Sequence, residues 1–305
     1  MAALWALRRC LPGQGKQRIQ ETSRSGGFSL AAIAVFNPKG GVGKTTLSVN
    51  LAWESARAGN RTLLWDLDGQ GDSTAMLVES RQPPRMDAAR LMHGIADIQA
   101  HILPSKIAGL DVLVPEEDMR RTDNWFVHMA QQQRLGRLLV ELKERYDRIV
   151  IDCPPGLGDT ARRLLLVTDL IIVPVIPAPL AVRGLERVRD YVTHKRGRHA
   201  PILPVFSMVD RRRMLHKAAL ADHPDWPVVP MSSAAEQMSC SRLPVGVMTP
   251  DSPAARVFRA LWNGIDSKLC QMRVARKVST PLAAAPFDAP RGAGSRRLAS
   301  APAQS

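Results

Sequence analysis

Two lysines and three glycines lie within ten residues of the sequence, NPKGGVGKTT at 37–46. Glycine has no Cβ atom, so the backbone here can turn successive N–H groups toward the oxygens of a phosphate. Lys44 can contact the β- and γ-phosphates of a nucleotide, and the Thr45 hydroxyl can ligate Mg²⁺. An apolar run precedes the segment and a helical pattern follows it, which is the context of a phosphate-binding loop. A glycine-rich turn with chance lysines is the alternative.

The head of the same segment departs from the usual phosphate loop, which reads Gly, four residues, then Gly-Lys-Ser/Thr. Pro38 occupies the position of the first glycine, and a second lysine, Lys39, stands five residues before Lys44. The segment therefore indicates either a damaged nucleotide site or a different kind of site that uses two lysines.

Two later apolar runs end in carboxylates that could complete such a site. The first is followed by DLDGQGD, in which Asp68 and Asp72 could orient a water molecule or hold Mg²⁺ through its hydration shell. The second ends in Asp152, a position typical of a Mg²⁺ ligand, and leads into Pro-Pro-Gly156. Each pattern alone is also typical of an ordinary turn. The three elements in this order favour a nucleotide-binding enzyme.

Short apolar runs alternate with helical patterns along the middle of the chain. Strands are expected at 30–36, 61–67, 110–115, 147–152, 170–175, 202–206 and 226–230. Helices are expected at 44–58, 128–145, 157–168, 180–197 and 252–270. Several runs are continuously apolar, as in parallel strands that are covered on both faces. The alternation predicts an α/β fold with a single doubly wound, mostly parallel sheet that binds ligands at the C-terminal ends of its strands. The polar stretch 79–109 predicts no clear element.

Charge and composition suggest where the chain departs from a folded domain. The 305 residues carry a net charge of +14, which suggests a polyanionic partner, yet residues 1–28 contribute +4 and residues 271–305 contribute +5. We expect 1–28 to be a basic disordered extension, 29–270 the folded domain, and 271–305 an Ala/Pro/Arg-rich disordered tail. Four scattered cysteines argue for a reducing compartment and against zinc or iron–sulfur chemistry.

The motifs together resemble the ParA/MinD family of P-loop ATPases, and the ParA/Soj partition branch more closely than MinD. The family's deviant Walker A motif, KGGxGK[ST], matches 39–45, and the resemblance continues in order over about 29–270. Further matching segments are DLDGQGDST, DCPPGLGD, 174–188, 207–215 and 243–261. The resemblance implies a P-loop NTPase fold of the deviant Walker A type that uses ATP and Mg²⁺.

The resemblance also implies roles for individual residues. Lys39 would cross to the partner's nucleotide in an ATP-sandwich homodimer, Lys44 would serve its own nucleotide, and Asp68 would position the attacking water. Mg²⁺ would be supported by Thr45, Asp72 and Asp152. The nucleotide-binding set implied by the resemblance is Gly40, Gly41, Val42, Gly43, Lys44, Thr45, Thr46, Asp152 and Gly156.

By the same resemblance, the protein would be a slow, Mg²⁺-dependent and partner-stimulated ATPase that binds DNA without sequence preference as an ATP-bound dimer. Hydrolysis would release the dimer, and the cargo would be segregated or positioned through a ParB-like protein or another cargo adaptor. The expected location is the cytoplasm of a bacterium, at the nucleoid. The cargo could equally be a protein assembly, such as a microcompartment or a chemoreceptor cluster.

A basic cluster provides the expected DNA contact: Arg211, Arg212, Arg213 and Lys217. A charge run of this kind is by itself more often a solvated helix start. Met231 stands where relatives often have an arginine, and Arg242 or the basic tails could compensate, since phosphate binding depends more on the number of cations than on their positions.

Rival interpretations come from other branches of the family. A MinD-like membrane-associated ATPase could use the apolar face of 252–277 to dock on lipid, although such a face more often packs on the core. We do not expect a membrane partner. An iron protein would need cysteines close after the Walker B and switch II segments, and only Cys153, next to Asp152, lies there. A cobyrinate amide synthase would need a substrate pocket for which no motif is visible.

Overall fold

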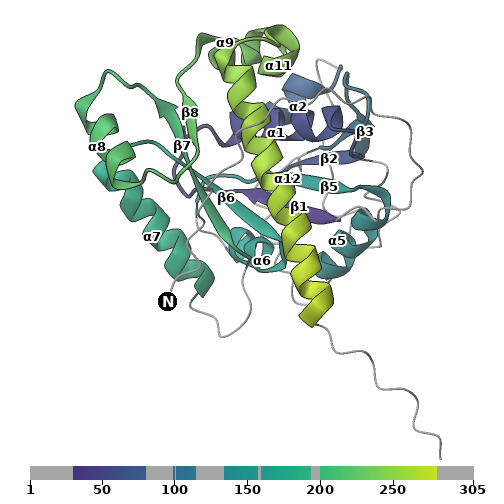
Figure 1. The fold of residues 1–305 in the computed structure, drawn as a ribbon. Helices are drawn as coiled ribbons and strands as arrows, with labels where there is room; N and C mark the ends of the chain where they lie inside the picture. Colours follow the sequence, from purple (N-terminus) through teal and green to yellow (C-terminus); the bar gives the residue numbers. More distant parts are fainter. Residues whose placement is uncertain are drawn as a thin grey trace, which may run out of the picture.

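The computed structural model describes residues 30–79, 99, 101–114, 134–156, 159–193 and 200–279. These residues form a layered α/β structure around one eight-stranded sheet with the order β3-β4-β2-β5-β1-β6-β7-β8 (Figure 1). The strands are β1 Ala31–Val35, β2 Thr62–Asp66, β3 Ile102–Pro104, β4 Leu110–Leu113, β5 Arg148–Asp152, β6 Leu170–Val175, β7 Ile202–Val209 and β8 Val228–Pro230. All pairings are parallel except β3 with β4. The predicted fold class is confirmed.

Helices cover both faces of the sheet. They are α1 Lys44–Arg57, α2 Asp72–Leu77, α5 Arg134–Arg145, α6 Asp159–Val167, α7 Pro179–Thr193, α8 Met214–Asp222, α9 Ser233–Glu236, α10 Met238–Ser241, α11 Val245–Met248 and α12 Pro253–Ser279. Alternate residues of β1 point to opposite faces, as the two-residue period of a strand requires. Ala32 and Ala34 face α5, α6 and α7, whereas Ile33 and Val35 face α1 and α12. This alternation produces two hydrophobic cores, one on each side of the sheet.

The seven expected strands are present, with ends that differ by at most three residues. The structure adds β3, within the stretch that the sequence left unassigned. It also adds α8 and the shorter helices α2, α9, α10 and α11. Helix α12 continues to Ser279, nine residues beyond its expected end. Residues 128–133, 157–158 and 194–197 of the expected helices, the extension 1–28 and positions 280–305 of the tail lie outside the described residues.

The apolar face of α12 packs against the sheet. Its five large apolar residues are all at most 7% exposed: Phe258, Leu261, Trp262, Ile265 and Leu269. The core-packing interpretation of this face is therefore confirmed. No helix in the described ranges is long and apolar enough to cross a membrane.

Helix α11 packs unusually closely on α1. A Cβ atom added to Gly246 would lie 2.1 Å from the ring of Trp53, which is itself 8% exposed. Such a contact would force one helix to move, so only glycine fits at this position.

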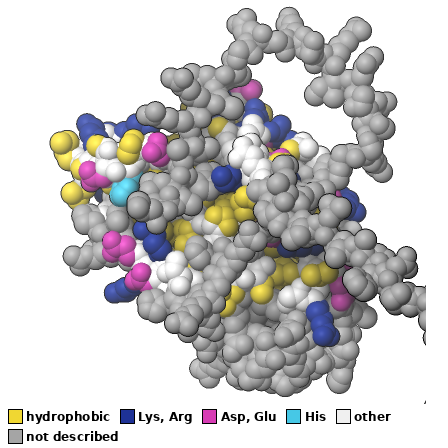
Figure 2. Space-filling view, turned by 60° about the horizontal axis from the view of Figure 1, so that its bottom comes forward, with side chains coloured by type: hydrophobic (Ala, Val, Ile, Leu, Met, Phe, Trp, Pro, Cys, Tyr) yellow, Lys and Arg dark blue, Asp and Glu magenta, His cyan; other side chains and the backbone are white. Residues whose placement is uncertain are grey.

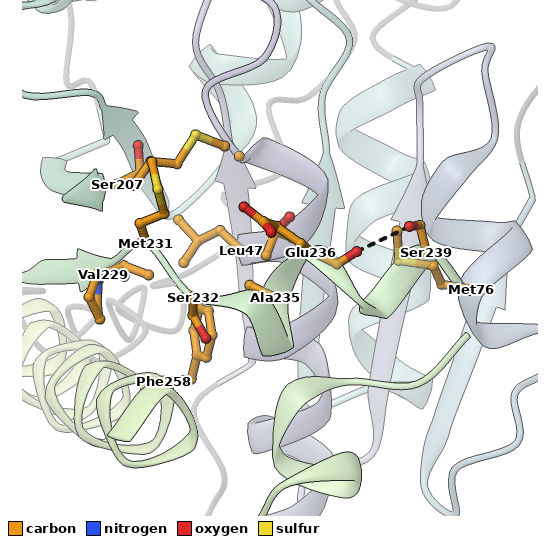
Figure 3. A pocket seen from close by; sticks show the side chains of 14 residues that line it. Leu47, Met76, Ser207, Val229, Met231, Ser232, Ala235, Glu236, Ser239 and Phe258 are labelled. Atoms are coloured by element: carbon orange, nitrogen blue, oxygen red, sulfur yellow. Dashed lines mark hydrogen bonds between the residues drawn. The ribbon is translucent and has the colours of Figure 1, made fainter. Parts of the chain in front are cut away.

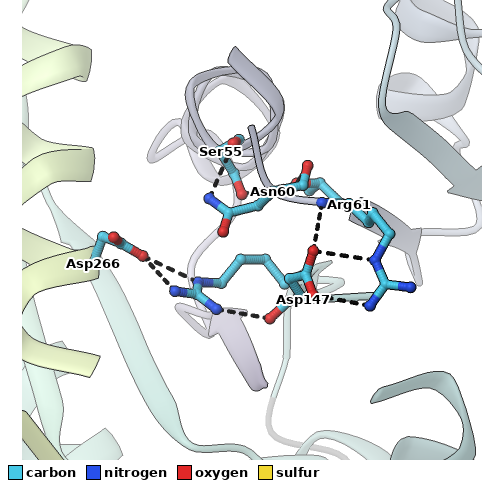
Figure 4. Close-up of polar contacts among 7 residues, drawn as sticks. Ser55, Asn60, Arg61, Asp147 and Asp266 are labelled. Atoms are coloured by element: carbon cyan, nitrogen blue, oxygen red, sulfur yellow. Dashed lines mark hydrogen bonds and ion pairs between the residues drawn. The ribbon is translucent and has the colours of Figure 1, made fainter. Parts of the chain in front are cut away.

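Charged residues at the N-terminal ends of β2 and β5 form ion pairs (Figure 4). Arg61 Nη2 lies 2.9 Å from Asp147 Oδ1, and Arg148 Nη2 lies 2.5 Å from Asp266 Oδ1 on α12. The Arg148 side chain is 2% exposed, and its Nη1 also donates to the carbonyl oxygen of Asp147 at 2.8 Å. This end of the sheet is thus tied to α12 through paired charges.

Candidate nucleotide site

The segment between β1 and α1 forms a loop at the C-terminal edge of the sheet. Gly41 and Gly43 adopt left-handed conformations with φ of 70° and 85°, which residues with a Cβ atom rarely adopt. Gly43 is also the N-cap residue of α1, and this 14-residue helix begins at Lys44. The free N–H groups and the positive end of the helix dipole therefore face the loop, an arrangement that suits an anion.

Neighbouring strands hold this loop in place. The Asn37 side-chain amide donates to Pro174 O at 2.7 Å, while its Oδ1 accepts the Lys39 N–H at 2.9 Å. The Gly156 N–H donates to Pro38 O at 3.0 Å. The segments that follow β5 and lie in β6 thus fix the loop from both sides, and Pro38 participates through the carbonyl that any residue provides.

The two lysines have opposite environments. Lys44 is 7% exposed, and its ammonium donates to Lys39 O at 3.0 Å, within the loop. Burial lowers the pKa of Lys44, while the carboxylates of Asp152 and Asp68 act in the opposite direction. The Lys39 side chain is exposed. One lysine therefore belongs to the interior of the loop, and the other is available to a separate molecule.

Two carboxylates lie side by side beneath the loop. Asp66 and Asp152 are partners in the β2–β5 ladder, and they are 0% and 1% exposed. The hydroxyl and N–H of Thr74 donate to Asp66 Oδ2 at 2.6 and 2.9 Å, and Ser48 Oγ donates to Asp152 Oδ1 at 3.1 Å. Burial raises the pKa of both carboxyls, and the neighbouring charge of Asp66 raises that of Asp152 further. Two ionised carboxylates so close together repel each other, so a nearby cation or a bound proton stabilises the pair.

Asp152 and Thr45 suit a hard cation. Asp152 Oδ2 is buried without a hydrogen-bond partner among the described residues, and the Thr45 hydroxyl hydrogen-bonds the same side chain. Carboxylate and hydroxyl oxygens are ligands that Mg²⁺ accepts. Within the ranges that the structure describes, no three His, Cys, Asp or Glu side chains cluster at metal-binding distance. Asp152 and Thr45 would supply part of the coordination sphere of an ion that is held jointly with phosphate.

The two other predicted carboxylates differ in their positions. Asp68 is half-buried and acts electrostatically on Lys44, and its Oδ1 accepts the Gln70 N–H at 3.1 Å. Asp72 is exposed at the first turn of α2 and is not among the charged groups that shift the pKa of Lys44. Asp68 and Asp152 thus act on the loop lysine, whereas the Asp72 side chain is exposed at the start of α2.

A cavity of about 310 Å³ opens beside the loop (Figure 3). Gly43 and Thr46 form its border with the loop, while Met76 of α2 and Ser239 of α10 form the distant wall. Met208 lines a further side; its φ of 54° lies at the irregular pairing of β7 with β8. The lining is predominantly apolar, which suits a flat heteroaromatic group attached to phosphates that occupy the loop.

Sequence reasoning assigned no role to several residues at this site. Asn37 anchors the loop, Ser48 contacts Asp152, and Thr74 contacts Asp66. Ser48 could have been found, because it lies one helical turn after Lys44 and so shares its face of α1. Asp66 could have been found as a carboxylate at the last position of a continuously apolar strand.

The basic cluster lies at the start of α8, away from the loop lysines in sequence. Arg211, Arg212, Arg213 and Lys217 are all exposed. Arg212 is bidentate with Asp210, with Nε–Oδ1 at 2.9 Å and Nη2–Oδ2 at 3.0 Å. These hydrogen bonds lower the pKa of Asp210 to about 2. The left-hand part of Figure 2, where α8 lies in Figure 1, mixes basic, acidic and apolar side chains. One of the four predicted DNA-binding cations is thus already paired.

The loop, the helix that it opens and the carboxylate at the end of β5 define a P-loop nucleotide-binding protein. Comparison with known proteins agrees with this. Residues 30–203 match the family model described as an AAA domain. The chain is 30% identical over 203 residues to the chromosome partitioning protein ParA of Caulobacter vibrioides, covering 63% of this chain and 75% of that protein. It is 35% identical over 161 residues to the sporulation initiation inhibitor protein Soj of Bacillus subtilis, covering 52% of this chain and 64%, slightly under two thirds, of Soj.

Solved structures show the same fold. The cell division ATPase MinD of Pyrococcus furiosus superposes with a TM-score of 0.64 at 24% identity, covering 78% of this chain and 99% of that chain. Apo McdA of Cyanothece gives a TM-score of 0.63 at 18% identity, covering 77% and 99%. The chain belongs to the ParA/MinD-type P-loop ATPases.

Proposed function

We propose that the protein is a dimerising ATPase which, when it binds ATP, binds DNA without sequence preference and positions or segregates a cargo. Hydrolysis would be slow, Mg²⁺-dependent and stimulated by an adaptor, and it would release the dimer. The observation that carries this proposal is the contrast between buried Lys44 and exposed Lys39. A single nucleotide can be served by Lys44 alone, so an exposed lysine next to the phosphates suits the nucleotide of a second subunit.

The loop geometry supports a defined pose for the nucleotide. The phosphates would contact the N–H groups of 40–46, and the base would enter the cavity beyond Gly43 and Thr46. Thr45 and Asp152 would hold Mg²⁺, which neutralises the charge that develops on the transferred phosphate. Asp68 would orient the attacking water, and Lys39 of one subunit would reach the phosphates of the other. Asp72, exposed on α2, could contribute only through the hydration shell of the ion.

We also propose that residues 29–270 are the ATPase domain and that the basic ends, 1–28 and 271–305, are accessory segments. The partners would be a second copy, non-specific DNA at the bacterial nucleoid and a ParB-like or other adaptor in the cytoplasm. The ParA and Soj relatives support a partition role, and the sequence similarity covers only part of each protein.

The first test separates the two lysines. Lys44→Ala should lower the affinity for a fluorescent ATP analogue by about 100-fold or more, because a charge-assisted phosphate contact is lost inside the loop. Lys39→Ala should keep the affinity within a few-fold but prevent ATP-dependent dimerisation. The measurements are fluorescence titration and light scattering after gel filtration. Normal dimerisation of the Lys39 variant would contradict the role in trans, and normal ATP binding by the Lys44 variant would contradict the nucleotide site itself.

The second test concerns DNA. Arg211→Gln combined with Arg213→Gln should weaken ATP-dependent DNA retention by about tenfold at moderate salt, since each dimer loses four phosphate contacts. Arg212→Gln is the matched control and should change retention less, because Arg212 is already bound to Asp210. An equal loss of retention in Arg212→Gln and in the double variant would contradict this ranking. Unchanged retention in the double variant would move the DNA contact elsewhere, to the basic tails first.

A further inference from the structure

Arg242 has an unusual backbone conformation. It separates α10 from α11 and has φ of 57° and ψ of 38°, the left-handed region that disfavours residues with a Cβ atom. Only Met208 shares a positive φ among the non-glycine residues that the structure describes. Such a conformation persists where the contacts of the residue determine it.

The contacts of Arg242 explain why this conformation is retained. Its Nε donates to Ala75 O at 2.6 Å, and its Nη2 donates to Val78 O at 2.6 Å. Both carbonyls lie at the C-terminal end of α2, where helix carbonyls lack partners within the helix and carry partial negative charge. A guanidinium can satisfy two such carbonyls with its fixed fork of donors. The contact joins segments about 165 residues apart in sequence.

A further segment, around Lys106, also contacts the end of α2 near the Arg242 guanidinium. The Lys106 N–H donates to Leu77 O at 3.1 Å, so a second segment also ends on α2. Burial lowers the pKa of the Lys106 side chain, the positive charge of Arg242 adds to this, and Glu79 opposes it. The end of α2 is therefore a meeting point of charged groups.

The same short helix also contacts the carboxylates of the nucleotide site. Thr74 donates twice to Asp66, and the other oxygen of Asp66 accepts the Asp68 N–H at 3.2 Å. Between the two ends, Met76 faces the cavity, and Ser239 of α10 lines the same cavity. A contact that holds α2 against α10 therefore also restrains the loop that carries Asp68.

We propose that Arg242 is a positioning residue that holds α2 against α10 and thereby sets the position of Asp68 for ATP hydrolysis. The role rests on the proposed function, and it replaces the earlier suggestion that Arg242 supplies a cation for DNA. The described hydrogen bonds of the Arg242 guanidinium reach the C-terminal end of α2. Arg242 acts through α2, Thr74 and Asp66.

Three variants test the role. Arg242→Gly tolerates the left-handed backbone and removes the guanidinium. It therefore abolishes the clamp, which is the pair of hydrogen bonds from Arg242 to α2, without straining the backbone. Arg242→Lys keeps the charge but can reach only one carbonyl at a time. Arg256→Ala, on the exposed side of α12, is the control for loss of a surface arginine. Each full-length protein is examined by hydrogen–deuterium exchange without nucleotide and by single-turnover and steady-state ATP hydrolysis.

For Arg242→Gly we expect faster exchange across residues 72–78 and about tenfold lower kcat, with KM for ATP changed less than kcat. Arg242→Lys should recover part of both, and Arg256→Ala should match the unmodified protein. Unchanged exchange in α2 would overturn the clamp. Faster exchange with unchanged kcat would overturn its link to hydrolysis. The exchange measurement needs no nucleotide, so it tests the clamp even if the Lys44 experiment rejects ATP binding.

Discussion

Charged residues lie at both ends of strands β2 and β5. At the N-terminal end they are paired with opposite charges, whereas at the C-terminal end two like charges are neighbours. At the N-terminal end, Arg148 and Asp266 satisfy each other, and Arg61 pairs with Asp147. At the C-terminal end, two carboxylates lie together in the interior with their pKa values raised. The first arrangement is complete without a ligand. The second favours added positive charge, because burial and mutual repulsion disfavour two ionised carboxylates.

The largest effect should follow from Asp152→Asn. The change removes the carboxylate charge at the proposed Mg²⁺ position but keeps its size, so ATP turnover should fall by about 100-fold or more. The apo protein should remain folded, as judged by circular dichroism. Turnover within a few-fold of the unmodified protein would break the distinction between the two ends, because the C-terminal carboxylates would then be dispensable.

An intermediate effect should follow from Asp266→Ala. Breaking an ion pair of a buried arginine costs about 3–5 kcal/mol, and we expect about 2 kcal/mol because the Asp266 side chain is 34% exposed. Urea unfolding measures the change, and Asn263→Ala on the exposed face of α12 is the control. ATP affinity should be unaffected. A large loss of ATP affinity would show that the N-terminal end also serves the nucleotide.

A smaller effect should appear in the pH dependence of stability. The folded-state pKa of Asp66 is raised above its ordinary value of 3.8, so its contribution to stability is present at low pH and is lost as the pH rises through the raised pKa. Asp66→Asn should therefore show a smaller loss of apo-protein stability between about pH 5 and pH 8 than the unmodified protein, by about 1 kcal/mol or more, since one pKa unit is worth about 1.4 kcal/mol.

The opposite sign is expected at the other end of the sheet. Hydrogen bonds from Arg61 lower the pKa of Asp147, so its contribution is present above its ordinary value and is lost as the pH falls through the lowered pKa. Asp147→Asn should destabilise the protein at pH 7, by under about 1 kcal/mol because Arg61 is largely exposed. Urea unfolding across a pH series compares the two variants, and effects of the same sign would contradict the comparison.

Much of the fold could be predicted because its strands are short, continuously apolar and separated by helices. That pattern arises only when both faces of a parallel sheet are covered. β3 could not be predicted in the same way, because it has three residues, is only partly buried and contains Pro104. The helices α9 to α11 have four residues each, too few for a helical period to show in the sequence.

The loop residues of the site could also be predicted, because glycines and lysine at fixed spacing follow directly from the chemistry of phosphate. The cavity beside the loop could not, since its walls come from α1, α2, β7, β8, α9, α10 and α12, and only the tertiary structure brings them together. The contacts of Arg242, which the sequence offered beside the basic tails as a cation that could compensate at Met231, could not be predicted for the same reason: the sequence shows its charge, whereas the carbonyls that it binds lie more than 160 residues away.

The close approach of Gly246 to Trp53 limits the substitutions that the two positions can accept. A residue with a side chain at position 246 fits this fold only if position 53 holds a residue smaller than Trp. A smaller residue at position 53 leaves a cavity unless a larger residue at position 246 fills it. Substitutions at the two positions are therefore tolerated only in combination. Among related chains, they should change as a correlated pair rather than independently.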